Sequence, residues 1–91
     1  MYRNSFQITE DILGSISQQG TEGTTITPLI REANLSHKRT LGFINKLTES
    51  NLINRIEVRG KTVFVITQRG KVYLNEYKKF ASIAENFGLE L

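Results

Sequence analysis

The chain has 91 residues, of which 38% are hydrophobic, so it has room for one compact core and for no separate catalytic domain. With no cysteine, one histidine and one aspartate, the composition excludes a disulfide framework and a thiolate zinc site, and it predicts no enzyme, no bound metal and no cofactor. The net charge of +3 favours an anionic partner only weakly.

The position of the charge is more informative than its total. Residues 1–35 carry a net charge of −2, residues 36–61 carry +4 and residues 62–91 carry +1. No stretch approaches the ~20 apolar residues that a membrane-spanning helix needs, so we expect a cytoplasmic protein with no membrane partner.

Helical spacing of apolar residues predicts a first helix over residues 5–18, with Ser5 as its N-cap and Gly20 just past its end. A glycine-containing loop follows over residues 20–24, and Thr25 and Ile26 are expected to form a very short strand. The four residues expected to face the core are Ile8, Ile12, Leu13 and Ile16.

A second, short helix is predicted over residues 28–33, with Thr27 as its N-cap and Pro28 at its first position. Asn34 suits the left-handed conformation that ends a helix. Ser36 then caps a third helix, predicted over residues 36–50 including its cap. Its core stripe follows helical spacing and consists of Thr40, Phe43, Ile44 and Leu47.

Two runs rich in β-branched residues, residues 52–58 and 62–66, flank Arg59-Gly60-Lys61 and predict a β-hairpin. Ile56, Phe64 and Ile66 are expected to face the core. After Thr67, which can cap a helix, a last helix is predicted to end at Gly88.

The apolar residues of this last helix step by 4, 3, 4 and 3, which is the spacing of a coiled-coil seam. A helix of about 20 residues spans ~30 Å, longer than one small domain needs. We therefore expect Tyr73 and Leu74 to pack on their own domain and the rest of the seam to form a homodimer. The expected dimerisation residues are Tyr77, Phe80, Ala84 and Phe87. The alternative, that the whole seam packs on the domain's own core, stays open.

The order of helix, short strand, helix, tight turn, helix and hairpin is that of a winged helix-turn-helix. The predicted fold class is thus mainly α with a small β-hairpin (α+β), extended by a long C-terminal helix. Residues 1–67 would form a DNA-binding domain, and residues 68–91 a dimerisation helix with a short tail.

In this fold the third helix enters the DNA major groove, and the hairpin, here residues 55–62, contacts the backbone. The exposed face of helix 36–50 is expected to carry basic and amide side chains, which pair with phosphate, guanine or adenine. Arg59 and Lys61 flank the hairpin glycine. The candidate DNA-binding residues are Ser36, His37, Lys38, Arg39, Gly42, Asn45, Lys46, Arg55, Arg59, Gly60 and Lys61.

Several short motifs carry a family resemblance over nearly the whole chain. They are Asn34-Leu35-Ser36, Phe43-Ile44 with Leu47, Leu52-Ile53, Phe64-Val65-Ile66-Thr67-Gln68-Arg69-Gly70, and Tyr73-Leu74. With them the chain resembles the archaeal winged-helix family of small basic DNA-binding proteins with a C-terminal coiled-coil helix.

This resemblance implies double-stranded DNA binding by a homodimer joined through antiparallel C-terminal helices, with a role in transcription control or on the nucleoid. It also implies that residues 36–46 are the recognition helix and residues 55–61 the wing. Two positions depart from the pattern. Asn51 stands where glycine is preferred, and Gly42 lies inside the recognition helix.

Two other functions remain open from the sequence. The chain could be a winged-helix protein-interaction module without DNA binding, in which the basic face meets an acidic partner. It could also be an effector-sensing regulator whose ligand lies in the dimer seam. Exchanging Lys38 and Arg39 for glutamate distinguishes DNA binding from the first of these.

Overall fold

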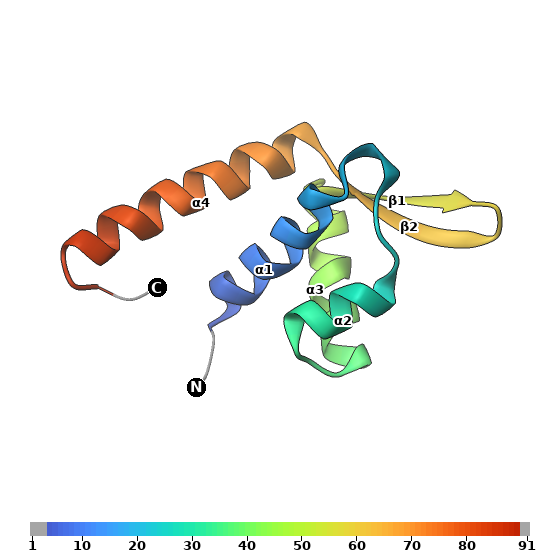
Figure 1. Ribbon diagram of the computed structural model, residues 1–91, viewed down its shortest axis with the longest axis horizontal. Coiled ribbons are helices and arrows are strands. Elements are labelled where there is room, and N and C mark those ends of the chain that lie inside the picture. The colour runs from blue at the N-terminus through green and yellow to red at the C-terminus, as the bar shows by residue number, and fades with distance from the viewer. Residues whose placement is uncertain (1–3, 90–91) are drawn as a thin grey trace.

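The computed structural model describes residues 4–89, and its four helices and two hairpin strands follow the predicted order (Figure 1). The fold class is confirmed: helices form most of the chain, and a two-stranded antiparallel hairpin precedes a long last helix. The elements are α1 (Ser5–Gln18), a 3-10 turn η1 (Gly20–Glu22), α2 (Ile26–Ala33), α3 (His37–Glu49), β1 (Ile53–Val58), β2 (Lys61–Ile66) and α4 (Gln68–Asn86).

The helix α1 has the predicted bounds, but its N-cap is one residue earlier than predicted. Asn4, not Ser5, is the N-cap: its side-chain oxygen accepts from the Gln7 backbone N–H at 2.8 Å, and the Gln7 side chain accepts from the Asn4 N–H at 3.0 Å. This reciprocal capping box satisfies two backbone donors at once. It therefore prevails over a cap at Ser5, because the residue three positions after Ser5 is Ile8, whose side chain cannot accept a hydrogen bond.

The start of α2 also differs from the prediction. The helix begins at Ile26 with Thr25 as its N-cap, so Thr27 is not the cap and Pro28 is the third helical residue. Proline is tolerated there because the first-turn N–H groups have no partner within the helix. The short strand expected at Thr25 and Ile26 is absent; instead Thr24 forms a single antiparallel bridge to Phe64.

The turn between α2 and α3 has the predicted form. Asn34 is left-handed at φ 53° and ends α2, and the Ser36 hydroxyl accepts from the Arg39 N–H at 3.1 Å and so caps α3. Asn51, at φ 61°, takes the same conformation after α3. Asparagine thus takes here the left-handed conformation that glycine most often supplies at the end of a helix.

The core lies where α1 meets α2, α4 and β2. Buried Thr40 is satisfied by donating its hydroxyl to the Ser36 carbonyl at 2.9 Å. The predicted stripes of α1 and α3 are buried, except that Phe43 is only half-buried. The buried apolar cluster is Ile8, Ile12, Leu13, Ile16, Leu29, Ala33, Ile44, Leu47, Leu52, Ile53, Phe64, Ile66 and Leu74.

The hairpin turns over two residues, Arg59 and Gly60, because Lys61 already pairs with Val58. This register places Phe64 and Ile66 on the core face, opposite Arg55 and Ile53. Ile56 falls on the other face and is 41% exposed, so the expectation that it faces the core is wrong. Side chains alternate along a strand. Ile56 is three residues from the buried Ile53 and pairs with Val63, so its side chain points away from the core.

Hydrogen bonds fix both ends of the last helix, α4. Thr67 caps α4 by accepting from the Gly70 N–H at 3.0 Å, as predicted, and it donates to the Asn51 carbonyl at 2.7 Å. At the far end, Gly88 and Leu89 donate to the Glu85 and Ala84 carbonyls, which is a Schellman ending. In Figure 1 α4 and the hairpin project to opposite ends of a molecule that is 48 Å long and 27 Å wide.

Within residues 4–89, no helix combines the length and the apolar character that crossing a membrane requires.

Candidate nucleic-acid interface

The exposed face of α3 is set by the residues that the helix buries. Thr40, Ile44 and Leu47 anchor one side of α3 in the core, so residues about half a turn away must face solvent. The candidate DNA-binding residues of that face are all exposed, and three of the five are cationic. They are Lys38, Arg39, Gly42, Asn45 and Lys46.

The N-terminal end of α3 concentrates positive potential. His37, Lys38 and Arg39 form its first turn, all three are exposed, and the turn contains no acidic residue. The free backbone N–H groups and the helix dipole add a partial positive charge at the same end. Anions, including phosphate groups, are favoured there.

The tip of the hairpin is a strained two-residue turn. Arg59 has φ 53° and Gly60 has φ 78°, the pair of left-handed residues that a type I′ turn requires. An arginine in this conformation costs about 1–2 kcal/mol, which asparagine or glycine would largely avoid. The turn presents the Arg59 side chain to solvent at the outermost point of the hairpin.

Between the tip and α3, the hairpin carries two further cations. The Arg55 guanidinium lies 5.9 Å from the centre of the Phe64 ring, a cation–π contact that restrains it on the face directed at the domain. Lys61 begins β2 and is exposed. The Glu57 carboxylate also lies on this hairpin and accepts from the Thr62 hydroxyl at 2.6 Å.

A groove with a volume of about 420 Å³ separates α3 from the hairpin. His37 of α3, Arg55 of β1 and Lys61 of β2 contribute to its walls, and no carboxylate lines it among the described residues. The sequence reasoning missed its other walls, because they depend on how the start of α2, α3 and β2 pack against one another. They are Thr25, Ile26, Leu41, Thr62 and Phe64.

The eleven predicted residues therefore fall into three groups. His37, Arg55 and Lys61 share the groove. Arg59 and Gly60 form the hairpin tip, and the remaining six, Ser36, Lys38, Arg39, Gly42, Asn45 and Lys46, cap or lie along the exposed face of α3.

Two of the predicted seam residues of α4 pack against their own chain, and two are exposed. Tyr77 is half-buried and stacks on Phe6 of α1, with ring centroids 6.4 Å apart, and Ala84 is buried. Phe80 and Phe87 are 57% and 77% exposed. Ile83 is 54% exposed beside them, and the sequence reasoning missed it because it lies outside the strict seam spacing.

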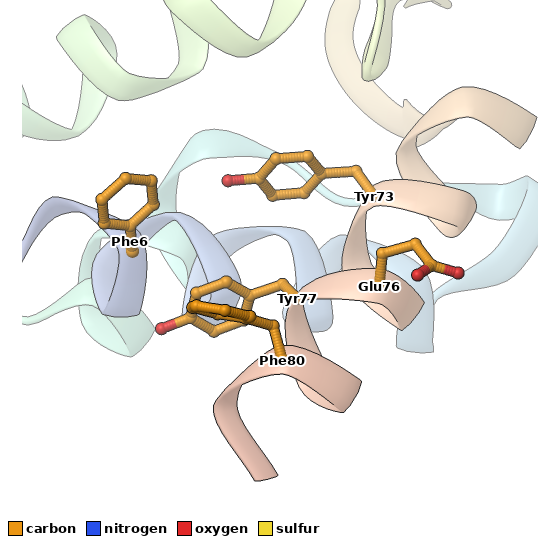
Figure 2. Close-up of a pocket in the computed structure, with 5 residues that line it drawn as sticks. All are labelled: Phe6, Tyr73, Glu76, Tyr77 and Phe80. Carbon is orange, nitrogen blue, oxygen red and sulfur yellow. The ribbon is translucent and has the colours of Figure 1, made fainter. Parts of the chain in front are cut away.

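Phe6, Tyr73, Glu76, Tyr77 and Phe80 line a pocket of about 240 Å³ between α1 and α4 (Figure 2). Burial raises the pKa of the Tyr77 hydroxyl, and the negative charge of Glu10 raises it further. The hydroxyl is therefore neutral at physiological pH. No group of three or more metal-ligating side chains occurs in the part of the chain that the structure describes.

The family model for winged helix-turn-helix domains matches residues 2–85. No curated protein shows significant similarity to the chain.

Solved structures share this fold at low sequence identity. Sso10a-2, a DNA-binding protein from Sulfolobus solfataricus, is 23% identical with a TM-score of 0.77, over 93% of this chain and 85% of that one. A mutant of MepR from S. aureus is 13% identical (TM-score 0.76), and BpsR from Bordetella bronchiseptica is 18% identical (TM-score 0.74). The alignments cover 88% and 91% of this chain but only 61% and 58% of those two.

Proposed function

Because the chain belongs to the winged helix-turn-helix family, we propose that it binds double-stranded DNA as a transcriptional regulator or chromosome-associated factor. The observation that carries this proposal is the exposed basic face of α3 beside a groove whose walls include Arg55 and Lys61 of the hairpin. Sso10a-2 is described as a DNA-binding protein, which supports the same function. No reaction and no cofactor form part of it.

In the proposed complex, helix 36–50 lies in the major groove. Lys38 and Arg39 pair with phosphate or guanine edges at the end of α3 where backbone N–H groups are free, and Asn45 offers the donor and acceptor that read adenine. Gly42 lies between them on the same face. Its missing side chain lets the helix approach the duplex closely.

The hairpin, residues 55–62, acts as the wing and contacts the backbone. Arg55 and Lys61 approach one phosphate from the groove that they share with His37, and Arg59 reaches further along the strand from the tip. The left-handed conformation of Arg59 supports this role. Backbone strain of this kind is typical of functional positions, and asparagine at position 59 would relieve it. Phosphate contacts position the protein and carry no sequence information.

We propose the division of labour expected from the sequence: residues 1–67 bind DNA, and residues 68–91 join two copies. Residues 1–3 and 90–91 of these ranges lie outside the described part. The exposed Phe80 and Phe87 support a homodimer, and the similarity to Sso10a-2 supports a relationship to the archaeal coiled-coil family. A chromosome-associated role places the protein in the cytoplasm, on the nucleoid.

Charge reversal at α3 tests this function. The double variant Lys38→Glu/Arg39→Glu should lose most of its affinity for a fluorescent duplex and keep its melting temperature, because acidic residues in a first helical turn suit the helix dipole. Lys71→Glu/Lys78→Glu, on the exposed face of α4, makes the same change in net charge outside the proposed interface.

The control variant should retain clearly more affinity than the α3 variant. Equal affinity of both double variants would move the binding site away from α3 and favour a protein-interaction module.

A further inference from the structure

The pocket between α1 and α4 has the form of a receptor for a side chain of another helix. Its four residues on α4, namely Tyr73, Glu76, Tyr77 and Phe80, stand at positions i, i+3, i+4 and i+7. Four residues at this spacing form the hole that accepts one knob from a facing helix in a coiled coil. We propose that the knob is Phe87 of a second copy of this chain, an inference that rests on the proposed homodimer.

The chemistry of the pocket fits an aromatic side chain. Aromatic rings come from four of its five residues, and Figure 2 shows the Glu76 carboxylate pointing away from them. Glu76 pairs there with Lys79 at 3.5 Å. Aromatic pairs prefer offset or edge-to-face packing, which a phenyl ring in a pocket of about 240 Å³ can adopt.

Phe87 is the large hydrophobic residue with the highest exposed fraction among the described residues, at 77%. It lies two helical turns after Phe80 on the same side of α4 and is held at the C-cap by the hydrogen bond from its N–H to the Ala84 carbonyl at 3.1 Å. Its own chain leaves it uncovered. A second molecule can cover it while it fills that molecule's pocket.

Two-fold symmetry determines where the other exposed phenylalanine falls in this register. If Phe87 enters the hole centred between Glu76 and Tyr77, the axis crosses α4 near position 82. The same axis then places Phe80 opposite positions 83 and 84 of the partner, where Ile83 is exposed and Ala84 is already buried by its own chain. One axis thus satisfies both exposed phenylalanines, as an isologous interface requires.

Other arrangements fit less well. If Ile83 filled the hole, the two Phe80 side chains would face each other near the axis, large against large. A parallel pairing in register would set Glu76 against Glu76, and like charges repel. The antiparallel register centred near position 82 avoids both.

This register also makes α1 part of the interface. Phe6 forms one wall of the pocket and stacks on Tyr77, so the partner's C-terminal end would contact the DNA-binding domain itself as well as α4. Each domain is then held by both copies of α4. The distance between the two α3 helices is thereby fixed.

Phe87→Trp tests the assignment, because the chain contains no tryptophan and the new indole reports its own surroundings. Emission should move to shorter wavelength as the protein concentration rises through the dimer dissociation constant measured by sedimentation. Adding Phe6→Ala should weaken dimerisation at least about tenfold, as truncating a buried aromatic anchor does, and should reduce the shift. Val72→Ala, also exposed on α4 but outside the pocket, should change neither.

The outcomes separate this inference from the proposed dimer. A chain that stays monomeric throughout, with an exposed indole, overturns the homodimer and this register with it. A dimer whose indole stays exposed, or whose shift is insensitive to Phe6→Ala, overturns only the pocket assignment. A blue-shifted indole in a monomer also overturns it, because the pocket would then hold its own chain's ring. Disulfide formation by Glu76→Cys alone would indicate the parallel pairing and contradict the register.

Discussion

At the scale of single residues, two glycines in helices differ in whether the fold leaves space for a side chain. A Cβ on Gly70 would overlap the Leu52 carbonyl oxygen and come within 2.8 Å of the Ile66 side chain, whereas a Cβ on Gly42 would meet nothing within 4 Å. The sequence shows both only as interruptions of a helix. Leu52 is the residue that leaves no space for a side chain at position 70. It belongs to the segment before the hairpin, so no local sequence pattern around Gly70 could reveal the contact.

Gly70→Ala should therefore destabilise the fold. The added methyl group cannot be accommodated without moving the start of α4 away from Leu52, and overpacking of this kind costs roughly 1–3 kcal/mol or more. Chemical denaturation should show a lower midpoint than in the wild type. An unchanged midpoint would mean that α4 does not depend on this contact.

Gly42→Ala should have two effects of opposite sign. The fold should gain about 1 kcal/mol, because alanine is the better helix former and the site is open. Affinity for duplex DNA should fall, because the methyl group stands on the face proposed to approach the bases.

Gly14→Ala is the matched control for this substitution. Gly14 lies inside α1, also with open space around its Cα, so the same gain in stability should leave DNA affinity unchanged. Equal DNA affinity of both variants would remove Gly42 from the proposed interface.

At the scale of elements, helix and hairpin positions were predictable, and their ends less so. Asparagine, serine and threonine can all cap a helix, so the choice of Asn4 over Ser5 depended on the partner Gln7. The error at Ile56 followed from the hairpin turn. The three-residue connection expected from the sequence would pair Val58 with Thr62 and place Ile56 opposite Phe64 on the core face. The observed two-residue turn pairs Val58 with Lys61 instead, so Ile56 lies opposite Val63 on the other face.

Arg59→Asn separates the stability of the hairpin from its proposed interaction with phosphate. Asparagine accepts the left-handed conformation readily, so the melting temperature should rise. Removing one cation that neutralises a phosphate lowers the steepness of log K against log salt concentration by about 0.9, so a dimer, which carries two copies of Arg59, should show a slope shallower by roughly 2. A higher melting temperature with an unchanged slope would exclude Arg59 from the phosphate backbone.

At the scale of the whole molecule, charge and shape separate the two proposed tasks. The basic face of α3 and the hairpin lie in the segment of net charge +4, and the exposed apolar residues Phe80, Ile83 and Phe87 lie on the helix that projects the other way (Figure 1). The seam spacing predicted which helix would carry them. It could not predict the pocket, because Phe6 comes from the first helix, near the opposite end of the sequence.

Phe80→Glu should convert a dimer into a monomer, because it would bury a carboxylate at the centre of the proposed interface. Sedimentation should show the smaller species, and the salt dependence of DNA binding should fall to about half. Ser82→Glu adds the same charge to the opposite side of α4 and should leave the dimer intact. A monomeric wild type, or a dimeric Phe80→Glu variant, would contradict the proposed role of α4.

The central claim, that a basic helix and wing bind duplex DNA as a dimer, is tested most directly by titrating a fluorescent duplex with the wild-type protein at several salt concentrations. With about 3–4 phosphate contacts per subunit, the slope of log K against log salt concentration should be roughly −5 to −7. A flat line, or no binding at low salt, would contradict the claim.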